Sequence, residues 1–163
     1  VRAFGASCVA EGSGYLRATL RGALEARIDW PNAGTHCEGG SRPEGRGLRL
    51  SFYREPAGEP NLLFVFGIAD VRAGATARAV GVNVTVFVRG TSRVFGTRSD
   101  ERCTIDKLTQ TALAGPVKGP RRYRVEARGF CTQPAHAVRG EGSVLVSTFD
   151  FAGLATLEEG TVL

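Results

Sequence analysis

Four cysteines are the residues of this chain whose type and spacing most clearly allow chemistry, because paired thiols can form disulfides or hold a metal ion. Cys103 and Cys131 are equidistant from Val117, which lies in a turn-rich stretch of glycines and prolines. If the chain turns back there as a hairpin, the two cysteines face each other, and Thr109 faces Val125. The sequence therefore predicts a Cys103–Cys131 disulfide across two antiparallel strands.

The other two cysteines, Cys8 and Cys37, are almost equidistant from Gly22, which predicts a second hairpin closed by a second disulfide. The apolar positions on either side of Gly22 pair best in a register one residue away from that of the cysteines, so this hairpin needs a β-bulge. Two disulfides indicate an oxidising compartment. We therefore expect an exported protein of the periplasm, the cell surface or the medium.

The alternative use of the cysteines is metal binding, because His36 adjoins Cys37 and His136 lies shortly after Cys131. Structural zinc sites usually contain closely spaced ligand pairs such as CxxC or HxxxH. The chain contains neither pattern. We expect disulfides, no metal site and no cofactor.

Nucleophilic catalysis needs a base beside the nucleophile, and the two histidines are the only imidazoles. Ser41 and Ser143 are possible neighbours of the histidines, but neither lies in a GxSxG context. Glycoside hydrolysis instead needs two carboxylates facing one cleft. Spacing singles out no pair among the candidates Asp29, Glu38, Glu44, Asp106 and Asp150. We therefore assign no catalytic residue and expect a protein that is not an enzyme.

The densest basic stretch lies near residues 121–128 and is the main candidate for binding. The chain has a net charge of +5. On a strand, Arg122, Arg124 and Arg128 share one face, where they could bind phosphate, an acidic polysaccharide or an acidic protein surface. Tyr123 points to the other face, which removes the aromatic interleaving that nucleic-acid stacking requires. The alternative interpretation is a solvated strand face whose charge prevents edge pairing.

These residues must be positioned by strands, because alternation of apolar and polar residues dominates the chain. We predict strands at 15–20, 24–30, 47–54, 61–70, 81–89, 93–98, 102–110, 121–132, 142–151 and 154–157. Residues 61–70 are apolar on both faces, which is typical of a central strand covered on both sides. Trp30 shares the apolar parity of its strand and is expected in the core. Residues 31–46 form a predicted long loop and a second candidate contact region.

About nine to ten short strands at even spacing predict an all-β, antiparallel β-sandwich, jelly-roll or immunoglobulin-like, with residues 1–163 in a single domain. No apolar run reaches the roughly 18 residues of a transmembrane helix. The chain lacks an initiator Met and an apolar N-terminal run, so we expect a signal peptide to have been removed.

Function is predicted only by class. We expect an exported, non-enzymatic binding or assembly module that recognises a protein or an acidic envelope polymer, and not nucleic acid. One alternative is a structural subunit of a surface assembly, in which the apolar residues 161–163 add a strand to another subunit. A less favoured alternative is a β-sandwich hydrolase.

Overall fold

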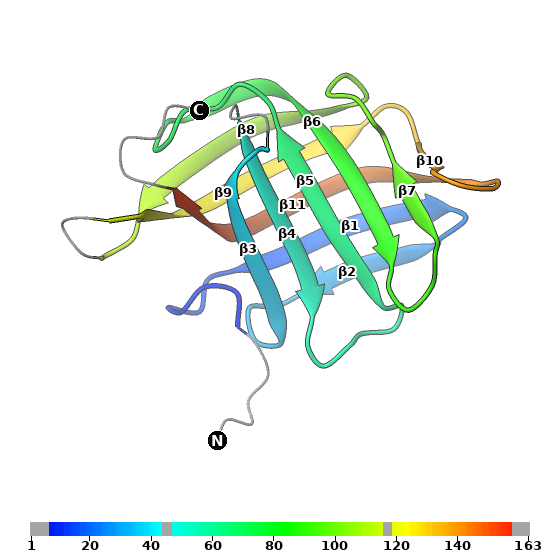
Figure 1. Ribbon diagram of the computed structural model, residues 1–163, viewed down its shortest axis with the longest axis horizontal. Coiled ribbons are helices and arrows are strands. Elements are labelled where there is room, and N and C mark those ends of the chain that lie inside the picture. The colour runs from blue at the N-terminus through cyan, green and yellow to red at the C-terminus, as the bar shows by residue number, and fades with distance from the viewer. Residues whose placement is uncertain (1–6, 44–46, 116–118, 158–163) are drawn as a thin grey trace.

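The computed structural model of the protein describes residues 7–43, 47–115 and 119–157, and all its regular elements are strands (Figure 1). Val117, Glu44 and residues 161–163 lie outside the described residues. The strands are β1 (Tyr15–Gly22), β2 (Ala26–Trp30), β3 (Thr35–Ser41), β4 (Leu48–Arg54), β5 (Leu62–Ile68), β6 (Ala77–Val88), β7 (Val94–Gly96), β8 (Cys103–Ala112), β9 (Arg121–Cys131), β10 (Ala135–Ala137) and β11 (Ser143–Leu157). The antiparallel all-β class is confirmed. No helix in the described part of the chain is long and apolar enough to cross a membrane.

One continuous sheet folds over itself into two layers. The front sheet is β3-β4-β5-β6 with β7, and the back sheet is β2-β1-β11-β9-β8 with β10. The long strand β6 joins the layers, because one of its edges pairs with β5 and the other with both β7 and β8. Figure 1 shows the front strands crossing over the back strands, so the apolar faces of the two layers meet.

Aromatic side chains fill the space between the layers. The ring of Phe66, in β5, lies 4.8 Å from that of Phe151 and 5.1 Å from that of Phe149, both on β11. Phe66 is completely buried. Trp30 is buried as predicted, with its ring 5.5 Å from that of Phe64. These contacts join the front and back sheets into one core.

The Cys103–Cys131 disulfide forms as predicted, between directly opposed residues of β8 and β9. Beyond it, the register changes around Asp106, the additional residue of a β-bulge. The predicted pairing of Thr109 with Val125 is therefore wrong, and Thr109 lies opposite Glu126 instead.

The Cys8–Cys37 disulfide also forms, but the hairpin used to predict it does not extend to the cysteines. The β1–β2 ladder ends with Leu16 opposite Trp30. Cys37 lies on β3, where it pairs with β4, and Cys8 precedes β1. This disulfide therefore joins the N-terminal segment (residues 7–14) to the front sheet.

The N-terminal segment lies between β2 and β3, which no described hydrogen-bond ladder joins. The Asn32 side-chain oxygen accepts hydrogen bonds from the backbone N–H of Val9, at 2.8 Å, and of Gly14, at 2.7 Å. The Cys8 sulfur lies 3.5 Å from the carbonyl oxygen of Ala152, on the back sheet. The segment thus closes the open seam between the layers.

Two elements were not predicted, β3 and β10. The loop predicted at 31–46 is wrong at its centre, where β3 forms. Gly39 and Gly40 resemble a loop, yet a Cβ at Gly39 would lie 2.7 Å from the carbonyl oxygen of Arg49 and 2.9 Å from that of Leu154. Glycine is therefore required there because β3 packs closely against the backbone of β11.

Candidate functional site

A row of five charged side chains crosses the outer face of the back sheet. Cross-strand pairing sets Asp29 of β2 opposite Arg17 of β1, and Arg17 opposite Asp150 of β11. The row continues with Arg128 of β9, opposite Asp150, and Lys107 of β8, opposite Arg128. The first four side chains face outward because their neighbours along the strand point into the core, and Lys107 faces outward beside the exposed bulge residue Asp106. We call these five residues the charged row.

One half of the charged row is neutralised by ion pairs. The Nε of Arg17 lies 3.6 Å from a carboxylate oxygen of Asp29, and its Nη1 lies 3.4 Å from one of Asp150. All three side chains are at least 40% exposed. Pairs this exposed contribute little to stability. Their main effect is to orient the carboxylates along the face.

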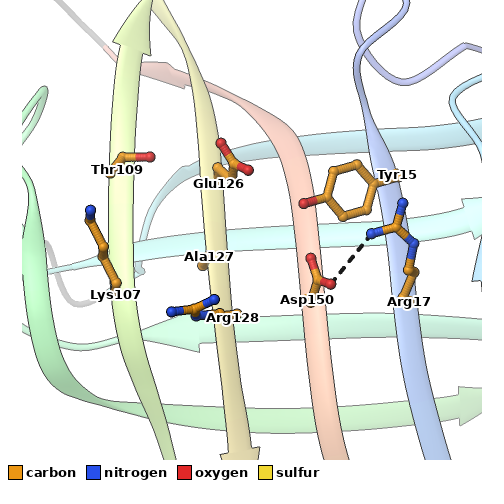
Figure 2. Close-up of a pocket in the computed structure, with 8 residues that line it drawn as sticks. All are labelled: Tyr15, Arg17, Lys107, Thr109, Glu126, Ala127, Arg128 and Asp150. Atoms are coloured by element: carbon orange, nitrogen blue, oxygen red, sulfur yellow. Dashed lines mark hydrogen bonds and ion pairs between the residues drawn. The ribbon is translucent and has the colours of Figure 1, made fainter.

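The other half of the row places two cations side by side. Lys107 and Arg128 are directly opposed across β8 and β9. In the described part of the chain, no acid lies within ion-pair distance of either side chain. Figure 2 shows Arg128 extending from β9 toward β8. Like charges directly opposed on a sheet are destabilising, and an anion bound there would relieve that repulsion.

The charged row lies in a groove formed by two adjoining depressions of about 430 and 540 Å³. Both are lined by Arg17, Arg128 and Asp150. The groove crosses the five strands from β2 to β8, roughly 19 Å at the usual strand spacing. Its further charged lining is Arg27, Asp106 and Glu126, so cations and carboxylates are balanced overall. Tyr15 and Phe130 add aromatic surface.

Tyr15 is held in its neutral form within the groove. Partial burial, a hydrogen bond to Asp150 and the nearby negative charges of Asp150 and Glu126 raise the pKa of Tyr15 to about 12, and Arg17 opposes the shift. In Figure 2 the Tyr15 hydroxyl is directed toward Asp150. At neutral pH this phenol is therefore a hydrogen-bond donor to Asp150 and not a nucleophile.

The raised pKa of Tyr15 predicts a loss of stability at high pH. The folded-state pKa, about 12, lies above the ordinary value of 10.0. The stabilisation is therefore complete below about pH 10 and is lost as the pH rises toward 12. Absorbance titration of wild type and Tyr15→Phe isolates this residue in the difference curve, with an expected midpoint near pH 12. A midpoint near pH 10 would contradict the partial burial of Tyr15 and its place beside Asp150 and Glu126.

The three arginines of the sequence hypothesis do share the outer face of β9, but they differ in surroundings. Arg128 lines the groove. Arg124 holds the N-terminal segment, since its Nε donates to the Ser13 hydroxyl at 2.8 Å and its Nη2 to the Ser13 carbonyl at 3.0 Å. Arg122 is exposed and donates to the carbonyl of Ala114 at 3.4 Å. Only Arg128 belongs to the groove.

The histidines do not assemble a catalytic group. His36 stacks on Tyr53, with ring centroids 4.7 Å apart, and its Nε2 lies 3.3 Å from a carboxylate oxygen of Glu38. His136 lies opposite Ser143 on neighbouring strands and is exposed. Over the described ranges, no cluster of three or more His, Cys, Asp or Glu side chains could hold a metal ion.

The carboxylates are partly gathered by the fold. Asp29, Asp106 and Asp150 all line the groove, whereas Glu38 lies on β3.

The sequence interpretation missed Lys107 and Arg17. No local signal marks them, because their importance comes from cross-strand register.

Comparison of the chain with models of protein families, with curated proteins and with solved structures finds no match in any of the three. Its function must therefore be argued from its own surfaces. The two disulfides indicate an oxidising environment.

Proposed function

We propose that the protein is a binding module for an acidic polysaccharide, which lies along the groove of the back sheet. The observation that carries this proposal is the directly opposed pair Lys107 and Arg128, which has no ion-pair partner within the described chain. An anionic group between the two cations would gain charge-assisted hydrogen bonds from both. It would also remove their mutual repulsion.

The rest of the groove favours a sugar chain over a small anion. Carboxylates such as Asp29 and Glu126 accept hydrogen bonds from hydroxyl groups, and the neighbouring arginines donate them. Tyr15 and Phe130 provide aromatic surface on which sugar rings can pack. A groove that crosses five strands also suits an extended polymer. Alternating charge favours a ligand whose anionic groups are separated by hydroxyls.

The two disulfides support a location outside the reducing cytoplasm, where acidic envelope polymers occur. We propose the periplasm, the cell surface or the medium as the site of action. A surface held by two disulfides and an aromatic core is suited to binding without rearrangement. In this proposal the protein binds its polymer and does not cleave it.

Binding to defined polymers tests the proposal. Wild type should bind polygalacturonate or dextran sulfate with an affinity that falls as salt rises, and should not bind neutral dextran. Lys107→Ala/Arg128→Ala should weaken binding at least about tenfold, because two charge-assisted contacts are lost. Isothermal titration calorimetry at several salt concentrations measures the effect.

The matched control is Arg72→Ala/Arg139→Ala, which removes the same net charge from exposed positions outside the groove. This control should bind as wild type does. If both double variants lost the same affinity for the acidic polymers, binding would depend on net charge alone, and the proposal would be overturned. Absence of binding to either acidic polymer would overturn it as well.

A further inference from the structure

A second surface, on the opposite side of the molecule, carries apolar side chains on the outer face of the front sheet. Tyr53 of β4, Leu63 of β5, Phe87 of β6 and Val94 of β7 form one cross-strand row. Val65 lies next to this row, two residues after Leu63 on β5. All five lie on the outer face because the alternate residues along these strands form the core.

The sequence of β5 predicts cover on both faces, and the described chain covers the outer face less completely than the inner one. Phe64 and Phe66 pack in the core, whereas Leu63 is only partly buried on the outer face. Outward-facing apolar residues at several neighbouring positions of a sheet mark an interaction surface. The partial exposure of the neighbouring outer-face residues Tyr53, Leu63, Phe87 and Val94 therefore makes this face a candidate interaction surface.

Arginines border this apolar surface. The guanidinium of Arg89 lies 4.3 Å from the centre of the Tyr53 ring. Arg49 is exposed on β4 and lies opposite Gly67. Arg42 lies at the same border and donates to Asp100 at 3.3 Å. The border therefore carries an excess of positive charge, unlike the balanced groove of the back sheet.

A hollow of about 250 Å³ lies between the arginines Arg42 and Arg49 and the apolar row, and Arg89 lies outside it. Val65 and Phe87 line it together with Gly67, whose missing side chain leaves the space open. Val65 is only 9% exposed, so the apolar floor is recessed. Insertion into a bilayer needs protruding apolar side chains. A recessed floor instead suits a side chain that protrudes from a partner protein.

We propose that the outer face of the front sheet binds an acidic segment of a partner protein. An apolar side chain of that segment enters the hollow over Val65 and Phe87. Its flanking carboxylates pair with Arg49 and Arg89, whose planar guanidinium groups suit carboxylate oxygens. This surface uses none of the residues of the polysaccharide groove. The protein thus links an acidic polymer on one face to an acidic protein on the other.

Peptides of defined chemistry test this proposal. The probes are peptides with one central Phe or Leu flanked by Glu and Asp, compared with peptides in which Lys replaces the acids or Ala replaces the apolar residue. In two-dimensional NMR spectra, the acidic apolar peptides should shift backbone amide signals of β4, β5 and β6. The Lys and Ala peptides should not shift them.

Variants separate this surface from the groove. Arg49→Glu should weaken peptide binding at least about tenfold, because a rim attraction becomes a repulsion. Arg72→Glu, an exposed control elsewhere, and the groove variant Lys107→Ala/Arg128→Ala should leave it unchanged. Phe87→Ser tests the hollow, and thermal unfolding verifies that each variant folds.

Three results would overturn the proposal. The first is that no acidic peptide shifts these amides at millimolar concentration. The second is that Arg49→Glu binds the peptides as wild type does. The third is that vesicles of phosphatidylglycerol and phosphatidylcholine bind the front face while peptides do not, which would assign this face to a membrane. None of these results bears on the groove, so the polysaccharide proposal stands or falls separately.

Discussion

Phe66→Ala should lower the free energy of unfolding by about 3–5 kcal/mol, the usual range for truncation of a buried Phe. The Phe66 ring lies within 6.2 Å of four other phenylalanine rings: those of Phe52, Phe64, Phe149 and Phe151. These residues belong to both sheets, so the cavity left by the change would separate the layers at their centre. The neighbouring phenylalanines lie on strands that are hydrogen-bonded within both sheets, so they cannot move to fill the cavity.

Urea unfolding monitored by far-UV circular dichroism measures this effect. Phe87→Ala is the matched control, because the same truncation falls on the outer face of the same sheet. Phe87 is partly exposed, so its replacement should cost clearly less than that of Phe66. Equal costs for the two changes would contradict the two-layer arrangement.

Removal of the Cys8–Cys37 disulfide by Cys8→Ser/Cys37→Ser should lower the free energy of unfolding by about 2–4 kcal/mol. It should also have a local effect that the other disulfide lacks. The sequence separations of the two disulfides are 29 and 28 residues. The entropy of the unfolded chain alone therefore predicts that removal of either disulfide lowers the free energy of unfolding by nearly the same amount.

The two disulfides differ in what else holds their partners together. Cys103 and Cys131 lie on paired strands, whose backbone hydrogen bonds remain after reduction. Cys8 precedes β1, and the disulfide is its covalent link to β3 across the open seam. Loss of this link should leave residues 7–14 and the edge of β3 free to open while the rest stays folded.

Hydrogen exchange followed by mass spectrometry distinguishes the two cases. Cys8→Ser/Cys37→Ser should show faster exchange in the N-terminal segment and β3 under native conditions. Cys103→Ser/Cys131→Ser should lower global stability with little local opening. Similar exchange maps for both variants would contradict the role of the Cys8–Cys37 bridge as a closure of the seam.

Much of the architecture could be predicted because strand alternation is local. The hairpin of β8 and β9 combines a strong alternation with a turn-rich centre, and its disulfide followed from that symmetry. The Cys8–Cys37 pair was also predicted, though from a hairpin that the register of β1 and β2 does not support. The pairing was therefore correct for a reason that was wrong.

What could not be predicted depends on contacts between distant segments. The stretch that contains β3 is rich in Gly, Ser, Arg and Glu, which predicts a loop, whereas in the structure Gly39 permits close packing against β11. The groove was missed for the same reason. Its Arg17–Asp150 pair joins residues 133 positions apart, and no periodicity within either strand reveals which strands are neighbours.

The bulge at Asp106 has a counterpart in the neighbouring strand. Ala79 of β6 occupies the matching place between pairs of the β6–β8 ladder and has a positive φ of 53°. The additional residue of β8 is thus matched in β6, and it brings a carboxylate into the groove without moving Lys107 from its place opposite Arg128. In evolution, an insertion or deletion at this point would have to occur in both strands together. In this chain, deletion of residues 79 and 106 together would keep the β6–β8 pairing on either side in register and would remove one carboxylate from the groove.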